Sequence, residues 1–275
     1  SATPSIDSYF NATAGKYGLV ELSTRYGDCL MPEIITVDVK ELKRKKIMKD
    51  TLFSPQLVEK VREALSRGEQ AILFQNRRGF APMIECRGCG WVPRCVNCDV
   101  SLTYHKAHNQ LVCHYCGYTY RLPQVCPECK GTEFKMQGFG TEKVEEEIAG
   151  QFPAVKVERL DFDTARTRTA YERIISDFEK GKTQILIGTQ MLSKGLDFGN
   201  VSVVGILSAD SLMNFPDFRA HERAYQLMVQ VSGRAGRRDK RGTVILQTTQ
   251  PEHPLIRMVQ HFAYKEMVSL QLSER

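Results

Sequence analysis

The sequence has no apolar run long enough to cross a membrane and no secretory signal, so we predict a cytoplasmic protein. It also has no large excess of one charge, because 38 Lys and Arg residues are offset by 32 Asp and Glu, which leaves a formal net charge of +6. This mild basicity permits a polyanionic partner without requiring one. A hydrophobic content of 42% over 275 residues is ordinary for one large or two modest globular domains.

A phosphate-binding loop of the form G-x-x-x-x-G-K-[ST] is absent, as is an acidic motif that would hold Mg²⁺. The segment Ala14–Tyr17 contains a Gly-Lys pair, but the preceding glycine and the following hydroxyl are missing. ATP hydrolysis is therefore not expected from these residues alone.

Cysteine, by contrast, is abundant and regularly spaced. Eight of the nine cysteines form C-x-x-C pairs in one short segment: Cys86/Cys89, Cys95/Cys98, Cys113/Cys116 and Cys126/Cys129. This spacing lets both thiolates of a pair bind one tetrahedral ion, and four thiolates complete a structural zinc site. The segment therefore predicts two Zn²⁺ ions in a reducing compartment, and four regular pairs disfavour the alternatives of redox pairs or a single ion. The ninth cysteine, Cys29, is expected to be a free thiol that is at least partly buried.

The four cysteine pairs can combine in three ways. Joining the first two pairs would close a site over only five intervening residues, which is cramped. The loop between the two inner pairs is close to the usual zinc-ribbon length, and closing it brings the outer pairs together. We therefore predict a nested arrangement, with Cys86, Cys89, Cys126 and Cys129 around one ion and Cys95, Cys98, Cys113 and Cys116 around the other.

Other residues of the cysteine segment have weaker interpretations. His105, His108 and His114 are alternative ligands, but eight thiolates already satisfy two ions, so we expect them to face solvent or DNA. The rings of Trp91 and Tyr115 suit stacking on bases and equally suit packing of a small core around the metals.

The flanks of the cysteine segment alternate between short apolar strands and amphipathic helices. Ser54 and Pro55 begin a helix, and Ala71–Gln75 is a compact strand after it. Further strands are expected at 156–160, 184–188, 201–207 and 242–248, and helices at 141–149, 169–180 and 220–231. This alternation predicts an α/β fold whose parallel sheet is covered on both faces, with the cysteine segment inserted immediately after the first strand.

Two motifs follow strands or helices of this α/β region. Gln230–Arg237 reads QVSGRAGR, and its two arginines can present planar guanidinium groups to one polyphosphate. Thr189–Phe198 reads TQMLSKGLDF and follows a strand, at the sheet edge where ligands bind in open α/β folds. Together with Ser1-Ala2-Thr3, these motifs resemble the later motifs of superfamily 2 nucleic-acid helicases.

The cysteine insertion narrows the resemblance to the primosomal replication-restart helicases, the PriA family. Residues 73–79, 138–142, 161–164, 216–220 and 251–254 also resemble that family, so the similarity covers nearly the whole chain. The resemblance implies a RecA-like motor lobe with a two-zinc insertion and ATP-driven DNA unwinding at stalled or collapsed forks. It also implies a bacterial, monomeric protein. The implied partners are forked and single-stranded DNA, single-stranded DNA-binding protein and primosome assembly proteins.

Individual roles follow from the same resemblance. Arg237 would be the arginine finger, with Arg234 beside it on the γ-phosphate. The implied ATP site, used with Mg²⁺ in the intact protein, consists of Gly195, Asp197, Gln230, Arg234 and Arg237; the implied DNA contacts are Thr189, Arg78 and Thr141. Some relatives lack an acid at the position of Asp197.

The implied domain organisation has four parts. Residues 1–50 would link the two motor lobes, 51–84 and 134–250 would form the second lobe, 85–133 the zinc insertion, and 251–275 the start of a C-terminal region. Since the first motor half is missing, we expect a fragment that is inactive toward ATP by itself. The alternative is a zinc-stapled module that binds DNA or primosome proteins without motor activity, for which the arginine pair and the Ser-Ala-Thr sequence would have no use.

Overall fold

The computed structural model describes residues 1–275 except 23–29, 50, 77–82, 99, 106–108, 114, 137–139, 194–195, 237–240 and 275. Among the described residues, no helix is both long enough and apolar enough to cross a membrane.

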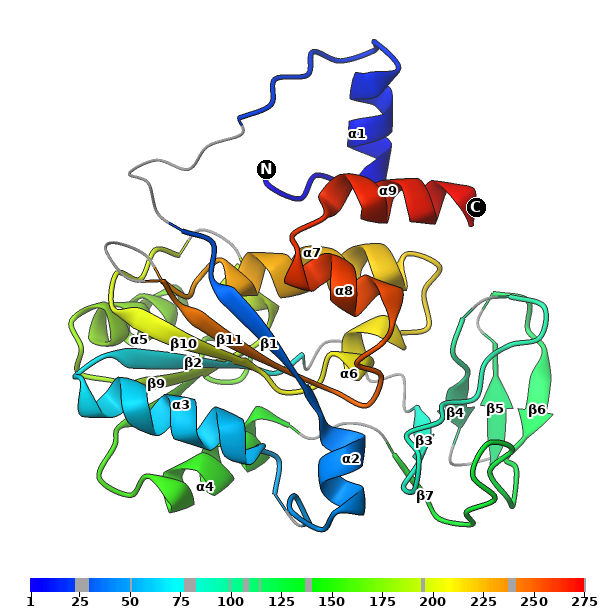
Figure 1. Ribbon diagram of the computed structural model, residues 1–275, viewed down its shortest axis with the longest axis horizontal. Helices are drawn as coiled ribbons and strands as arrows, with labels where there is room; N and C mark the ends of the chain where they lie inside the picture. Colours follow the sequence, from blue (N-terminus) through cyan, green and yellow to red (C-terminus); the bar gives the residue numbers. More distant parts are fainter. Residues whose placement is uncertain are drawn as a thin grey trace.

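A parallel sheet of six strands forms the centre of the molecule (Figure 1). In spatial order its strands are β1 (Glu33–Asp38), β11 (Thr243–Thr248), β10 (Val201–Ile206), β2 (Gln70–Phe74), β9 (Ile185–Gly188) and β8 (Val157–Leu160). The two strands β2 and β9 are buried along their whole length. Continuous apolar runs such as Ala71–Phe74 are typical of strands covered on both faces, and the parallel α/β prediction is confirmed.

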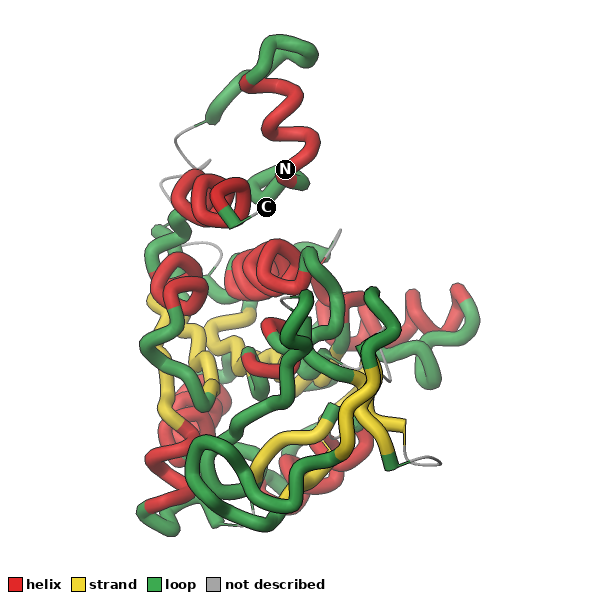
Figure 2. The backbone as a smooth tube through the Cα atoms, turned by 90° about the vertical axis from the view of Figure 1, so that its right-hand side faces the viewer, coloured by secondary structure: helices red, strands yellow, loops and turns green. Residues whose placement is uncertain are grey.

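Helices cover both faces of this sheet (Figure 2). One apolar cluster joins the sheet to α2 (Val39–Arg44), α3 (Pro55–Ser66) and α4 (Thr141–Gln151). The other joins it to α5 (Arg168–Glu179), the 3₁₀ turn η2 (Gln190–Ser193), α6 (Asp210–Met213), α7 (Ala220–Ser232) and α8 (Pro254–Gln260). Two further helices, α1 (Ile6–Thr13) and α9 (Tyr264–Ser273), lie outside α7, where the rings of Tyr9 and Tyr264 meet edge to face at 5.3 Å.

The strand β1 differs from the sequence-based expectation. We expected residues 1–50 to link two lobes, but β1 pairs in parallel with β11 from Glu33 to Asp38 and forms an edge of the sheet. The sheet therefore begins before residue 51, and the cysteine segment follows its second strand along the chain, not its first. The stretch EIITVD has only two buried residues, Ile34 and Val37, and lacks the continuous apolar run of β2, so it reads as an extended segment without indicating a place in the sheet.

The cysteine segment stands to one side of the sheet as a separate small body (Figure 1). Two short antiparallel strands, β3 (Ile84–Cys86) and β7 (Phe134–Met136), pair at its base, where the chain enters and leaves. Three more, β4 (Thr103–His105), β5 (Gln110–Val112) and β6 (Thr119–Arg121), form an antiparallel sheet beyond them. The pairing of β3 with β7 brings the ends of the insertion together, so α4 can resume the α/β order after β2.

Candidate metal centres and motor motifs

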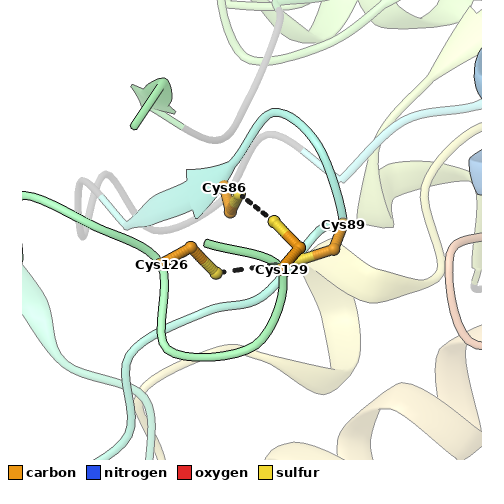
Figure 3. Close-up of side chains that lie close together, drawn as sticks. All are labelled: Cys86, Cys89, Cys126 and Cys129. Atoms are coloured by element: carbon orange, nitrogen blue, oxygen red, sulfur yellow. Dashed lines mark hydrogen bonds between the residues drawn. The ribbon is translucent and has the colours of Figure 1, made fainter. Parts of the chain in front are cut away.

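Two clusters of four cysteines lie in the insertion. The first consists of Cys86, Cys89, Cys126 and Cys129 (Figure 3), and the second of Cys95, Cys98, Cys113 and Cys116. Within each cluster all four sulfurs lie within 4.8 Å of one another. The structure thus brings together the two sets that the nested arrangement predicts, and among the described residues neither cluster includes a histidine.

The sulfur spacing of both clusters fits a tetrahedral zinc site. In the first cluster Cys86 Sγ lies 3.5 Å from Cys129 Sγ, and Cys89 Sγ lies 3.6 Å from Cys126 Sγ. In the second, Cys95 Sγ lies 3.6 Å from Cys116 Sγ. Four sulfurs at the usual Zn–S distance of about 2.3 Å stand about 3.8 Å apart, which is close to the separations of these three pairs.

The backbone repeats one turn at the cysteine pairs. In all four pairs the N–H of the first cysteine donates to the carbonyl five residues later, as from Cys86 to Trp91 and from Cys113 to Tyr118, each at 2.9 Å. In three pairs the residue after the second cysteine donates back to the first and has a positive φ, which Gly90 and Gly117 adopt without steric cost. The local sequence alone therefore shapes each half-site.

The thiols of these clusters have divergent acidities. Burial raises the pKa of Cys89 to about 12, whereas the backbone N–H of Gly131 lowers the pKa of Cys129 to about 7. Neutral and ionised sulfurs would thus coexist at pH 7 in an empty cluster, since four adjacent thiolates repel one another. Bound Zn²⁺ supplies the positive charge that lets all four ionise, so its role here is structural.

The remaining candidates of the insertion have separate positions. His105 ends β4 outside both clusters, while His108 and His114 lie outside the described residues. Trp91 is half-buried beside the first cluster, and Tyr115 is 49% exposed within the second. Cys29 also lies outside the described residues.

The Ser-Ala-Thr sequence packs against helix α7. The amide of Gln230 donates to the hydroxyl of Thr3 at 2.9 Å, and the amide of Gln226 donates to the carbonyl of Pro4 at 2.9 Å. One turn further along, the buried carboxylate of Glu222 accepts the backbone N–H of Ile6 at 2.9 Å. The structure therefore joins the N-terminal segment to the helix that leads into the arginine motif.

The contacts of Glu222 and Gln226 were not predicted from the sequence. Gln226 and Glu222 stand four and eight residues before Gln230, so all three lie on one face of the helix. That spacing was visible, but nothing in it showed that the face would meet backbone groups of a segment more than 200 residues away.

The side chain of Arg234, which was expected to contact the γ-phosphate, instead contacts backbone carbonyls of the protein. The side chain is buried, and its guanidinium donates to the carbonyls of Leu192 at 3.1 Å, Ser193 at 2.7 Å and Leu196. A guanidinium that ties three carbonyls of one loop is a structural cross-link, because its planar fork is already engaged. Arg234 thus connects the arginine motif to the segment that contains Gly195 and Asp197.

The other motor candidates lie at several places. Thr189 follows β9 at the carboxyl edge of the sheet and is buried, and the amide of the next residue, Gln190, donates to Asn76 Oδ1 beyond β2 at 3.3 Å. Asp197 is exposed. The residues Arg78, Gly195 and Arg237 lie outside those that the structure describes.

Thr141 is fully buried, which does not fit a side-chain contact with DNA. Its hydroxyl donates to the carboxylate of Asp161, which also accepts the backbone N–H groups of Asp163 at 2.9 Å and Thr164 at 3.0 Å. Burial alone would raise the pKa of Asp161, but these hydrogen bonds outweigh it and hold the pKa below its usual range. Thr141 therefore joins α4 to the end of β8.

Comparison with known proteins agrees with this geometry. A model of the helicase conserved C-terminal domain matches residues 132–239, and a model of the PriA DNA helicase Cys-rich region matches residues 95–121. The solved structure of RecG bound to a three-way DNA junction shares the fold with a TM-score of 0.54 at 13% identity, covering 100% of this chain and 26% of that one. The fold is that of a RecA-like helicase lobe, interrupted by a cysteine-rich insertion.

Curated relatives give the family. Replication restart protein PriA of Bacillus subtilis is 44% identical over 275 residues, which cover 100% of this chain and 34% of the relative. The protein of the same name from Haemophilus influenzae is 43% identical over 256 residues, covering 93% of this chain and 34% of the relative. The chain belongs to the PriA family, and it spans about a third of the length of these two relatives.

Proposed function

We propose that this chain is the second motor lobe, with its zinc-binding insertion, of an ATP-dependent DNA helicase that restarts replication. Such a helicase would unwind DNA at stalled or collapsed forks and load the primosome. The relatives' name, replication restart protein, and the helicase domain model support this assignment. Because the chain has neither a phosphate-binding loop nor an acidic Mg²⁺ motif, we expect it to hydrolyse no ATP by itself.

One contact carries the motor assignment, the hydrogen bond from Gln230 to Thr3. It places the Ser-Ala-Thr sequence at the last turn of α7, directly before the arginine motif. A motor needs such a connection, since a movement sensed at one motif must reach the other. A module that only binds DNA would have no use for it.

The proposed roles divide between contact with phosphate and positioning. Arg237 is proposed as the finger that stabilises charge on the γ-phosphate during ATP hydrolysis with Mg²⁺, and Gly195, Asp197 and Gln230 as its neighbours at the nucleotide. Arg234 is proposed as a positioning residue, because its guanidinium already binds the carbonyls of the 192–196 segment.

The DNA contacts and partners are also proposals. Thr189 and Arg78 would contact the DNA backbone at the carboxyl edge of the sheet. Thr141 would not contact DNA itself but would stabilise that edge through its hydrogen bond to Asp161. We propose forked and single-stranded DNA, single-stranded DNA-binding protein and primosome assembly proteins as partners of the longer, monomeric protein, acting in the cytoplasm. The clusters would hold two structural Zn²⁺ ions.

The test is Arg237→Ala in a full-length protein that carries this lobe together with a phosphate-binding lobe. We expect the rate of DNA-stimulated ATP hydrolysis to fall by about 10³-fold or more, as for other arginine fingers. The control is Arg241→Ala, which removes an exposed neighbouring arginine whose guanidinium donates to the carbonyl of Met31 at 3.0 Å. A near wild-type rate for Arg237→Ala with unchanged folding would contradict the motor assignment and leave the binding module as the better function.

A further inference from the structure

A cavity of about 290 Å³ lies between the insertion and the lobe. The insertion contributes Arg94 and Tyr115 to its lining, and the lobe contributes Phe215, Phe218, His221 and, at the end of α9, Glu274. Cys98 of the second cysteine cluster also lines the cavity, which therefore borders that metal centre. The cavity is near the lower limit of ligand pockets, so one small planar group suits it better than a longer ligand.

Two aromatic rings are held at the mouth of this cavity. The backbone N–H of Phe218 donates to the hydroxyl oxygen of Tyr115 at 3.2 Å, and the two rings meet edge to face at 6.1 Å. Tyr115 is fixed because it lies inside the turn between Cys113 and Cys116. Yet the two residues remain 49% and 53% exposed, whereas an aromatic pair that served only to join two bodies would be buried between them.

The charges around the cavity do not favour a phosphate group. Arg94 supplies a cation, but Asp217 and Glu274 supply two carboxylates to the same lining. Asp217 accepts the backbone N–H of Arg219 at 2.8 Å, and Glu274 accepts the amide of Gln271 at 2.5 Å, so both carboxylates are held in place. A neutral ring whose edge both donates and accepts hydrogen bonds fits this mixture, and that is the chemistry of a nucleobase.

His221, which lines the cavity, packs against a second histidine. His221 meets His253 at a ring distance of 5.3 Å. Burial, followed by the charges of His221 and Arg94, lowers the pKa of His253 to about 4. His253, which stands behind His221, is therefore neutral at pH 7 and adds no charge to this region.

The lobe side of the cavity follows the carboxyl edge of the sheet, where Thr189 is proposed to meet DNA. Its lobe residues follow α6, which leaves the carboxyl end of β10, and β10 is two strands from β9, where Thr189 stands. At about 4.8 Å between strands, this places the strand ends within about 10 Å of each other. The cavity and the proposed DNA contact at Thr189 thus belong to the same edge of the sheet.

We propose that the cavity between Tyr115 and Phe218 binds one unpaired base of single-stranded DNA by stacking on these rings. The inference rests on the proposed function, because it takes DNA as the ligand. It gives the insertion a specific part in that function: the second zinc cluster fixes one wall of a base-binding site, and the loop before α7 provides the other.

The experiment measures binding of this chain, loaded with zinc, to a short labelled oligothymidylate and to the same oligonucleotide without bases. Phe218→Leu removes the ring but keeps an apolar side chain. We expect it to weaken binding to the oligothymidylate about fivefold or more, the lower end of base–aromatic stacking, and to leave binding to the abasic oligonucleotide unchanged. Phe218→Trp should restore binding.

The control is Phe10→Leu, which alters a ring of similar exposure (51%) on α1 and should change neither affinity. Equal weakening of both oligonucleotides by Phe218→Leu, or no weakening of either, would overturn the base site. If the unaltered chain binds DNA but Phe218→Leu has no effect, only the base site fails. If the unaltered chain binds neither oligonucleotide, the DNA contact of this lobe fails with it.

Discussion

The lobe and the insertion differ in how they fill their interiors. In the lobe, large side chains pack on both faces of the sheet with almost no exposure, such as Phe178 on one face and Phe53 on the other. In the described part of the insertion, the apolar cluster has five buried members, Cys95, Val100, Leu102, Leu111 and Cys113, of which two are cysteines of the second metal cluster. A core this small stabilises a fold only with cross-links or metals, whereas the lobe has enough apolar surface to fold by burial alone.

The two regions meet at few points, and these are specific. Gly90 of the first cysteine pair stands so close to Thr249 that an added Cβ would lie 3.0 Å from its hydroxyl oxygen. Thr249 in turn donates to the buried carboxylate of Asp210 from its backbone at 2.8 Å and from its hydroxyl at 3.0 Å. The second point is the contact of Tyr115 with Phe218. Each metal cluster therefore supports one contact with the lobe.

Removal of zinc should produce the largest difference in stability between the two regions. Structural zinc in small domains contributes an apparent binding free energy of about 10–16 kcal/mol, so a chelator should unfold the insertion and leave the sheet intact. Hydrogen exchange should show loss of amide protection in β4, β5 and β6, with β2 and β9 still protected. Elemental analysis should find two zinc ions per chain, one for each cluster.

Cys29→Ser is the control for that experiment and should leave two zinc ions in place, because the eight paired cysteines already supply four thiolates to each cluster. A zinc content of one would contradict the assignment of two metal clusters. Loss of protection in β2 together with β5 would show that the lobe unfolds when the insertion does.

Arg234→Lys should destabilise the lobe and leave the insertion unaffected. A lysine has one ammonium group in place of a fork and cannot bind the carbonyls of Leu192, Ser193 and Leu196 together. We expect the free energy of unfolding of the lobe to fall by roughly 3 kcal/mol, as measured by urea denaturation, with zinc content unchanged.

The matched control is Arg173→Lys, because Arg173 is an exposed arginine whose ion pair with Glu158 at 3.0 Å should contribute little. Equal small effects of the two substitutions would contradict the structural role assigned to Arg234.

Two glycine substitutions test the contact between the regions. Gly90 and Gly117 occupy equivalent places in their turns, with φ of +77° and +72°, but only Gly90 has a neighbour within 4 Å. Alanine should cost about 1–2 kcal/mol at either position because of the left-handed backbone. Only Gly90→Ala should also increase hydrogen exchange at Thr249, since its methyl group presses on that side chain. The same increase with Gly117→Ala would mean that the contact is not local to the first cluster.

Sequence reasoning succeeded where a short segment decides its own structure. The cysteine spacing gave the turns and the ligand sets, and the apolar runs at Ala71–Phe74 and Ile185–Gly188 gave buried parallel strands. It failed where a distant partner decides. The extended run at residues 34–39 could be assigned to the sheet only through its pairing with β11, and the burial of Thr141 became evident only through Asp161. Arg234 matched a motif, but its partners are carbonyls, which any sequence supplies.

The sequence by itself determined the four cysteine pairs, because two residues between cysteines allow a tight turn with both sulfurs on one side, and the loop lengths between the pairs favoured the two four-cysteine sets. It also determined the α/β class, through continuous apolar strands between amphipathic helices. Only the tertiary structure decided that Gln230 meets Thr3 and that Tyr115 meets Phe218 across the gap between insertion and lobe. Both contacts join residues more than 100 positions apart, and their geometry depends on how separately folded segments pack, which no local pattern encodes.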